Sequence, residues 1–146
     1  MPIQIYNTLS RKKEPFIPRD PGCVSIYVCG ITPYDESHLG HAVPSIIWDA
    51  IRRFLEFRGY QVQLVQNFTD VDDKVIARAQ KTGEEVLVIS HRYAQEYLEA
   101  MDALGVKRAH VYPRVSQEIP AIIEMVEGLI EKNHAYVVDG DVYFDI

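Results

Sequence analysis

Three consecutive segments form a strand–helix–strand pattern that restricts the fold of this chain more than any other feature. Residues 24–30 (VSIYVCG) are a short apolar run ending in glycine, which is typical of a buried strand. Residues 42–57 place apolar side chains every three to five positions, which predicts a helix, and residues 61–68 (QVQLVQNF) alternate like a strand. A helix between two such strands predicts a parallel pair joined by a right-handed crossover. We therefore expect an α/β fold.

The remainder of the chain is predicted to be mostly helical. Helices are expected within residues 70–83, 83–105 and 116–133, with Ser116 as the N-cap of the last. The tail then carries Asp139-Gly140 between two apolar runs, which is a strong hairpin signal. Because the sequence stops within or beside the second strand of this hairpin, we expect it to be the amino-terminal portion of a longer protein.

Composition limits the class of protein. A chain of 146 residues that is 47% hydrophobic and 25% charged suits one modest globular domain. The formal charge of −6 argues against a main surface that grips nucleic acid, so an RNA partner would bind mostly elsewhere. No apolar run approaches the ~20 residues of a membrane span. Two cysteines, Cys23 and Cys29, give no disulfide framework, which favours a cytoplasmic protein.

Residues 29–42 (CGITPYDESHLGHA) lie between the first predicted strand and the first predicted helix. In open α/β sheets, ligands bind at this position, where helix N-termini offer free N–H groups. His38 and His41 are one helical turn apart and flank Gly40, so their rings could donate to phosphate oxygens. The alternative is that both histidines only cap the helix or face solvent.

A zinc site is the competing interpretation of the same stretch. Structural zinc usually takes four ligands, often from closely spaced pairs, whereas Cys29 stands alone and Cys23 lies six residues earlier. A self-contained site of Cys29, His38 and His41 is therefore not expected. Cys29 could still be one ligand of a site completed by distant residues, or a small buried side chain at a strand end.

Two motifs resemble a known family. Residues 27–41 (YVCGITPYDESHLGH) and 67–74 (NFTDVDDK) resemble the amino-terminal half of bacterial cysteinyl-tRNA synthetases, which are class I enzymes. Residues 38–41 look like the HIGH signature of that class, with Leu39 in place of isoleucine. The early IYNTLSRKKEPF and the late AYVVDGDVYFDI fit as well, so the resemblance spans nearly the whole chain.

The resemblance implies a fold and an activity. Residues 1–115 would form the first half of a Rossmann-type (HUP-like) nucleotide-binding domain, and residues 116–146 would begin the connective insertion. The complete enzyme, a cytoplasmic monomer, would activate cysteine with ATP and Mg²⁺ and transfer it to tRNA(Cys), which it would bind mainly through regions outside this chain. The 146 residues alone would be inactive.

The resemblance also implies roles for particular residues. Cys29 would be the first ligand of a zinc ion that binds the thiolate of substrate cysteine, with the other ligands beyond residue 146. The catalytic residues would be His38 and His41, and ATP would contact His38, Gly40 and His41. The cysteine pocket would be lined by Gly30, Thr32 and Thr69.

Several alternatives stay open at this point. Asp70, Asp72 and Asp73 belong to the second motif, yet they could equally be structural carboxylates at a helix N-terminus. The cysteine ligase of mycothiol biosynthesis shares the TPYD…HLGHA opening and also adenylates cysteine. The third possibility is a non-catalytic fragment that binds nucleotide or docks against a partner polypeptide.

Overall fold

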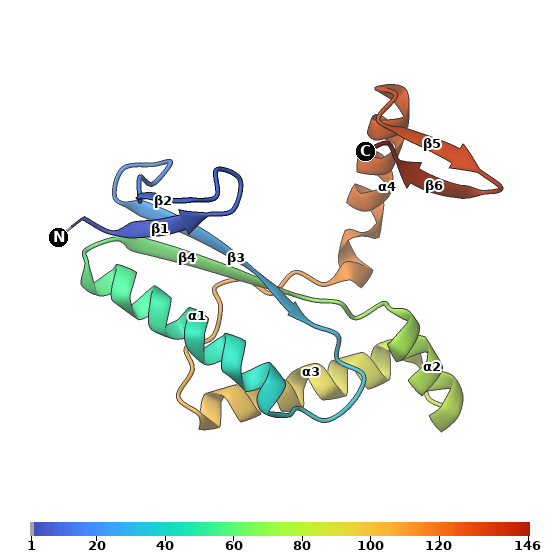
Figure 1. The fold of residues 1–146 in the computed structure, drawn as a ribbon. Helices are drawn as coiled ribbons and strands as arrows, with labels where there is room; N and C mark the ends of the chain where they lie inside the picture. The colour runs from blue at the N-terminus through green and yellow to red at the C-terminus, as the bar shows by residue number, and fades with distance from the viewer. Residues whose placement is uncertain (1) are drawn as a thin grey trace.

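The computed structural model describes residues 2–146 and contains the predicted strand–helix–strand unit (Figure 1). Strands β3 (Cys23–Ile31) and β4 (Gln61–Phe68) run parallel, with Ile26 opposite Leu64. Helix α1 (Leu39–Phe57) connects them and lies below the sheet in the view of Figure 1. The predicted α/β class and the parallel pair are thus confirmed.

A third extended segment, which the sequence pattern does not reveal, widens the sheet beyond β4. Val65 and Phe68 of β4 form parallel bridges with Val111 and Arg114. The backbone N–H of Phe68 donates to the carbonyl of Pro113 at 2.8 Å. The side chain of Phe68 is almost fully buried and contacts the rings of Tyr97 and Tyr112.

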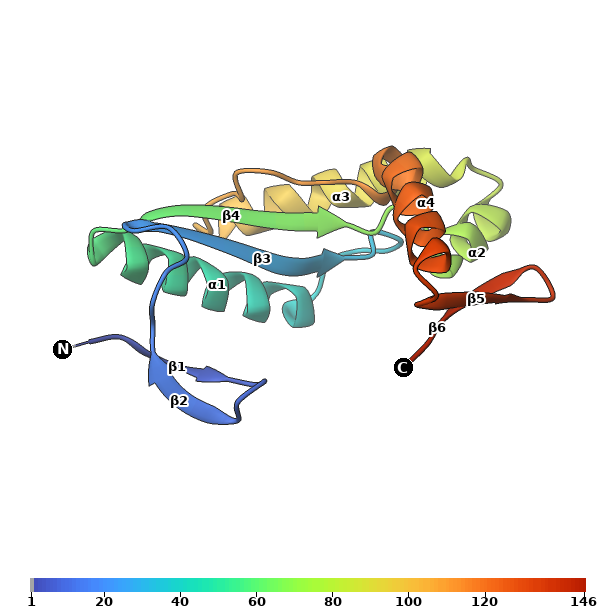
Figure 2. The ribbon, with the colours of Figure 1, turned by 90° about the horizontal axis from the view of Figure 1, so that it is seen from above.

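Two further helices complete the globular part. Helices α2 (Asp73–Thr82) and α3 (Val86–Ala103) follow β4, and α3 lies on the same side of the sheet as α1 (Figures 1 and 2). Between the sheet, α1 and α3 lies the main core, which consists of Ala42, Phe68, Ala94, Tyr97 and Met101. A second apolar cluster joins α2 to α3 and consists of Val75, Ala79, Ile89 and Tyr93. No helix within residues 2–146 has the length and apolarity needed to cross a membrane.

The two ends of the chain form antiparallel hairpins. Strands β1 (Gln4–Asn7) and β2 (Lys12–Pro15) make the first, which the sequence does not predict. Strands β5 (Ala135–Val138) and β6 (Asp141–Phe144) make the second, and it confirms the predicted hairpin. Its turn residues, 139 and 140, have φ of 52° and 93°, the left-handed conformation that a tight hairpin turn needs.

Helix α4 (Val115–Glu131) projects from the sheet towards the second hairpin (Figure 2) and has no buried residue. The predicted N-cap at Ser116 is wrong, because the helix starts after Arg114, which makes no side-chain cap. Ser116 instead donates from its backbone N–H and its hydroxyl to the buried carboxylate of Asp70, at 2.9 and 2.6 Å. Asp70 therefore satisfies the N-terminus of α4 from a distant part of the chain.

The other two acidic residues of that motif serve α2. Asp72 is the N-cap of α2 and accepts from the backbone N–H of Lys74 at 2.9 Å, and Asp73 is the first residue of the helix. Negative charge at these positions is favourable because the helix dipole is positive there. The structural interpretation is confirmed for this pair.

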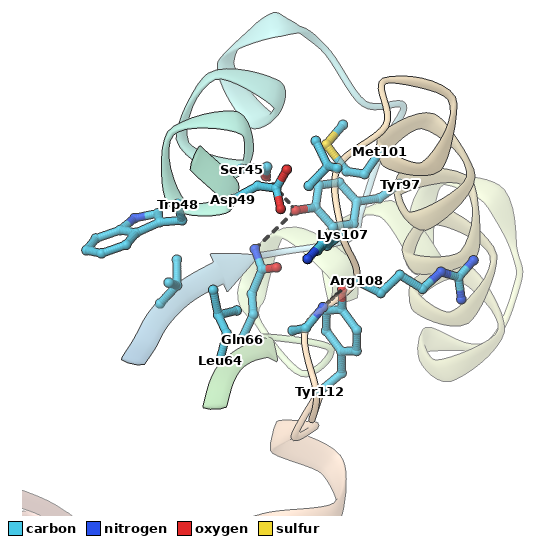
Figure 3. A pocket seen from close by; sticks show the side chains of 13 residues that line it. Ser45, Trp48, Asp49, Leu64, Gln66, Tyr97, Met101, Lys107, Arg108 and Tyr112 are labelled. Carbon is cyan, nitrogen blue, oxygen red and sulfur yellow. Dashed lines mark hydrogen bonds between the residues drawn. The ribbon is translucent and has the colours of Figure 1, made fainter. Parts of the chain in front are cut away.

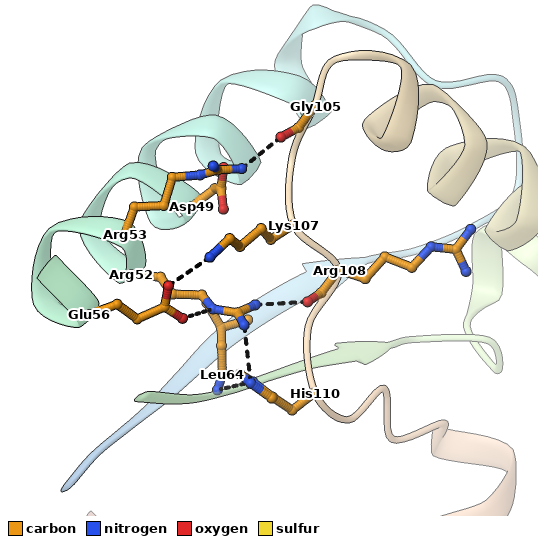
Figure 4. Close-up of polar contacts among 9 residues, drawn as sticks. All are labelled: Asp49, Arg52, Arg53, Glu56, Leu64, Gly105, Lys107, Arg108 and His110. Atoms are coloured by element: carbon orange, nitrogen blue, oxygen red, sulfur yellow. Dashed lines mark hydrogen bonds and ion pairs between the residues drawn. The ribbon is translucent and has the colours of Figure 1, made fainter. Parts of the chain in front are cut away.

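Polar contacts attach α1 to the loop that leads into the third extended segment (Figure 4). Arg52 donates to Glu56 at 2.8 Å and to the carbonyl of Arg108 at 2.9 Å, and Lys107 donates to the other oxygen of Glu56 at 2.7 Å. The hydrogen bonds from Lys107 and Arg52 hold the pKa of Glu56 below its usual range. The contacts with Lys107 and Arg108 thus join α1 to the loop that precedes the third extended segment.

The pairing of β3 with β4 shifts register between Val28 and Ile31, where Gly30 presses against Asn67. The backbone N–H of Gly30 donates to Oδ1 of Asn67 at 2.8 Å. A Cβ atom on Gly30 would lie 1.5 Å from the backbone oxygen of Asn67, far inside contact distance. Only glycine fits at position 30, next to the last residue of β3.

We expect Gly30→Ala to lower the free energy of unfolding by about 1–3 kcal/mol, the usual cost of overpacking a close contact. The matched control is Gly128→Ala, because Gly128 lies in α4 and a methyl group added there would have no atom within 4 Å. That substitution should stabilise the helix by about 0.5–1 kcal/mol. Urea-induced unfolding followed by circular dichroism measures both, and equal stabilities of the two variants would contradict the packing at Gly30.

Candidate functional site

A pocket of about 400 Å³ opens at the carboxyl end of β3, where the chain turns into α1. It unites residues from β3, the following loop, the first turns of α1, β4 and α2. The lining residues are Val28, Cys29, Gly30, Ile31, Thr32, Tyr34, His38, Gly40, His41, Pro44, Ser45, Gln66 and Lys74. Six of the seven residues predicted from the sequence are in this set, so the pocket brings together the thiol, the two histidines and the two glycines.

The seventh predicted residue, Thr69, is not among the lining residues. Its backbone N–H donates to the carbonyl of Ile31 at 3.0 Å, and its hydroxyl accepts from the amide of Asn67 at 3.3 Å. Thr69 thus holds the ends of β3 and β4 together beside the pocket.

The sequence did not predict four polar lining residues as site residues, and these are Tyr34, Ser45, Gln66 and Lys74. Lys74 ends the second motif, and its Nζ lies 5.6 Å from the centre of the Tyr34 ring. Ser45 is on the buried side of α1, and Gln66 is next to the motif on β4. Periodicity marks such positions only as helix or strand residues, and their shared pocket depends on the tertiary fold.

His38 forms the N-cap of α1, where the backbone is extended with φ of −134°. Its Nδ1 accepts from the backbone N–H of Gly40 at 3.0 Å, and Nδ1 of His41 accepts from the backbone N–H of His38 at 3.4 Å. The two rings stack with their centres 4.0 Å apart. Since Nδ1 is an acceptor in both rings, the neutral side chains carry their protons on Nε2. Each histidine therefore keeps one N–H donor for a ligand at the helix N-terminus.

Gly40 leaves the space that this arrangement needs. A Cβ atom on Gly40 would lie 2.7 Å from Cε1 and 2.9 Å from Nδ1 of His38. A side chain there would displace the His38 ring from its capping position.

The pKa of His41 is lowered from its ordinary value of 6.5, first by burial and second by the charge of His38. The neutral form of His41 is therefore favoured in the folded protein. The stability that this neutral histidine contributes is fully present above the pKa of His41 in the unfolded chain, which is about 6.5. It is lost as the pH falls from there through the lower pKa of His41 in the folded protein.

Cys29 is an exposed free cysteine within the same pocket. Residues 2–146 contain no group of three His, Cys, Asp or Glu side chains placed to hold a metal ion. Nδ1 of both His38 and His41 is occupied by a backbone N–H. Among the described residues that line the pocket, Cys29 supplies the one thiol.

The fold is similar to that of two solved structures. Mycobacterium tuberculosis methionyl-tRNA synthetase in complex with methionyl-adenylate matches with a TM-score of 0.65 and 18% identity, over 84% of this chain and 28% of that one. Agrobacterium radiobacter K84 agnB2 LeuRS, in a ternary complex with tRNA and LeuAMS, matches with a TM-score of 0.67 and 20% identity, over 82% of this chain and 16% of that one. The chain therefore shares its fold with a part of each of these two proteins.

Sequence comparison makes the assignment more specific. Residues 15–146 match the family model described as tRNA synthetases class I (C) catalytic domain, and the chain belongs to this family. It is 57% identical over 144 residues to the Cysteine--tRNA ligase of Anoxybacillus flavithermus and 54% identical to that of Pelotomaculum thermopropionicum. Both alignments cover 99% of this chain but only 31% and 30% of the relatives, so the chain spans less than a third of their length.

We expect the His41 side chain to titrate below pH 6.5 and its pKa to rise when His38 is replaced by asparagine. The His38→Asn substitution removes the neighbouring charge and keeps a good N-cap acceptor. Proton NMR titration of the two proteins gives both values. A parent pKa at or above 6.5, or no rise in the variant, would contradict the burial and stacking described for His41.

Proposed function

We propose that the protein containing this chain activates cysteine with ATP to form cysteinyl-adenylate and then transfers cysteine to tRNA(Cys). The observation that carries the proposal is the single pocket in which a thiol lies with two N–H donors at a helix N-terminus. The family match supports the class of reaction, and both relatives named above are tRNA ligases. They favour tRNA over the mycothiol precursor as the acceptor.

In the first step, a carboxylate oxygen of cysteine attacks the α-phosphorus of ATP. The bond from that phosphorus to the bridging oxygen breaks, and pyrophosphate leaves with the electron pair. Negative charge grows on the α-phosphate oxygens, where Nε2–H of His38 and His41 and the N-terminus of α1 would stabilise it. Gly40 would let the phosphates approach the backbone closely, and Mg²⁺ would accompany ATP.

The second step moves the amino acid. A ribose hydroxyl at the 3′ end of tRNA attacks the carbonyl carbon of the adenylate. The bond from that carbon to the phosphate oxygen breaks, AMP leaves with the electron pair, and the hydroxyl proton passes to the phosphate of AMP. The chain has a net charge of −6, so we propose that most of the tRNA contacts lie outside it.

The cysteine side chain would be recognised at the β3 end of the pocket. Cys29 would supply one thiolate ligand to a zinc ion, which when bound would coordinate the substrate thiolate and disfavour serine. Gly30 and Thr32 would shape the wall around the amino acid, and Thr69 would support that wall by holding the two strand ends together.

The domain assignment follows the same reasoning. Residues 1–115 would be the first half of the catalytic domain, and residues 116–146 would begin the connective insertion. The projecting helix α4 and its hairpin, with no buried residue in the helix, support a segment that packs against other parts of the complete protein.

Replacing His38 or His41 with alanine in the full-length polypeptide should slow cysteine-dependent ATP–pyrophosphate exchange by ~10²-fold or more. The matched control is His91→Ala, because His91 is an exposed histidine on α3 that does not line the pocket. It should leave the exchange rate unchanged. Near-wild-type exchange in both active-site variants would remove the proposed role of the two histidines.

Cys29→Ser in the full-length polypeptide should lower the bound zinc well below that of the parent and weaken discrimination between cysteine and serine. Cys23→Ser is the control, since Cys23 is exposed on the same strand but lies outside the pocket. Elemental analysis after dialysis measures the metal, and exchange assays with each amino acid measure selectivity. Equal zinc in the two variants would show that Cys29 is not a ligand.

A further inference from the structure

The hydroxyl of Tyr97 is a buried polar group that the proposed reaction does not use. Tyr97 lies on α3, and only 1% of its surface is exposed. Figure 3 shows its hydroxyl between Ser45 and Gln66. The distances are 2.8 Å to Oγ of Ser45 and 3.1 Å to Nε2 of Gln66. One side chain of α3 thus joins α1 to β4.

The directions of these hydrogen bonds follow from their chemistry. Ser45 donates its only hydroxyl proton to the backbone carbonyl of His41 at 2.9 Å, so its oxygen accepts from Tyr97. The oxygen of Tyr97 in turn accepts from the amide of Gln66. An unbroken chain of three hydrogen bonds therefore runs from β4 through α3 to the carbonyl of His41.

This hydrogen-bond network adjoins the candidate site. Ser45 and Gln66 line the 400 Å³ pocket, and Tyr97 does not. Tyr97 lines a second cavity, of about 20 Å³, whose lining also includes Ser45 and Gln66 (Figure 3). Any influence of Tyr97 on a ligand in the pocket must therefore pass through these neighbours and the first turns of α1.

The first turns of α1 need such support because Pro44 interrupts their hydrogen bonding. Proline has no N–H, so the carbonyl of Gly40 receives no bond from the residue four positions later. The hydrogen bond from Ser45 to the next carbonyl, that of His41, ties this weakened turn to Tyr97 and hence to the body of the domain.

We propose that Tyr97 is a positioning residue for cysteine activation, which holds the His38–His41 turn at a fixed place relative to β4. The inference rests on the function proposed above. Because the two histidines would act on charge that develops only in the transition state, a small displacement of their turn should lower kcat more than it changes KM.

The test compares Tyr97→Phe with Tyr93→Phe in the full-length polypeptide. Phenylalanine keeps the ring of residue 97 in its edge-on contact with Phe68 and removes only the hydroxyl. Tyr93 is a second buried tyrosine of α3, and its hydroxyl accepts from Arg78, away from the network. The control therefore loses one buried hydroxyl from the same helix.

We expect Tyr97→Phe to lower kcat of ATP–pyrophosphate exchange about five- to tenfold, with KM for ATP and for cysteine changed less than about twofold. Tyr93→Phe should leave both constants near those of the parent. Ser45→Ala combined with Tyr97→Phe should reduce kcat no more than the larger single effect, because both break one chain. Equal kcat in the two tyrosine variants, or additive effects in the double variant, would overturn the proposal.

A second measurement does not depend on activity. Amide hydrogen exchange of a peptide covering residues 38–47 should be faster in Tyr97→Phe than in the parent and unchanged in Tyr93→Phe. If the parent protein shows no cysteine-dependent ATP–pyrophosphate exchange, the proposed function is refuted. If amide hydrogen exchange of residues 38–47 is unchanged in Tyr97→Phe, the proposed role of the hydrogen-bond network is refuted.

Discussion

The contact between Gly30 and Asn67 determines where the candidate site can form. It lies where the pairing of β3 and β4 shifts register, and it lets the two strand ends approach more closely than any residue with a side chain would allow. Thr69 strengthens the same junction through its bond to the carbonyl of Ile31. The chain leaving β3 therefore starts from a junction that several contacts hold, and the pocket lies between that junction and the start of α1.

The start of α1 combines structural and chemical demands in two histidines. As N-cap, His38 uses one ring nitrogen to satisfy a backbone N–H that the helix leaves free. That bond orients the ring and directs its proton to the other nitrogen. Nδ1 of His41 accepts in turn from the backbone N–H of His38, which leaves the proton of His41 on Nε2 as well. The capping and ligand-binding interpretations of these histidines are thus compatible, since each ring has two nitrogens.

Much of the fold follows from local sequence patterns. The strands around α1, the parallel pairing and the second hairpin are all predictable because periodicity and turn residues act over short distances. The apolar periodicity starts the helix at Ala42 rather than Leu39, because histidine is an uncommon N-cap and gives no start signal. The segment around Val111 escapes prediction because short pieces of strand containing proline carry little pattern.

The polar contacts between distant segments are the least predictable part of the site. Asp70 caps a helix 46 residues further along the chain, so the motif that contains it gives no sign of its partner. Tyr97 looks like an ordinary core position on an amphipathic helix, and its hydroxyl acquires partners only when α1 and β4 pack against α3. Such residues are found from the fold, whereas Cys29, His38 and His41 are found from a motif.

A crystal structure of the full-length polypeptide with a non-hydrolysable sulfamoyl analogue of cysteinyl-adenylate would test the central claim most directly. We expect the sulfamoyl group to lie within hydrogen-bond distance of Nε2 of His38 or His41, with the cysteine side chain towards Cys29. An analogue bound with its sulfamoyl group away from the N-terminus of α1 would contradict it.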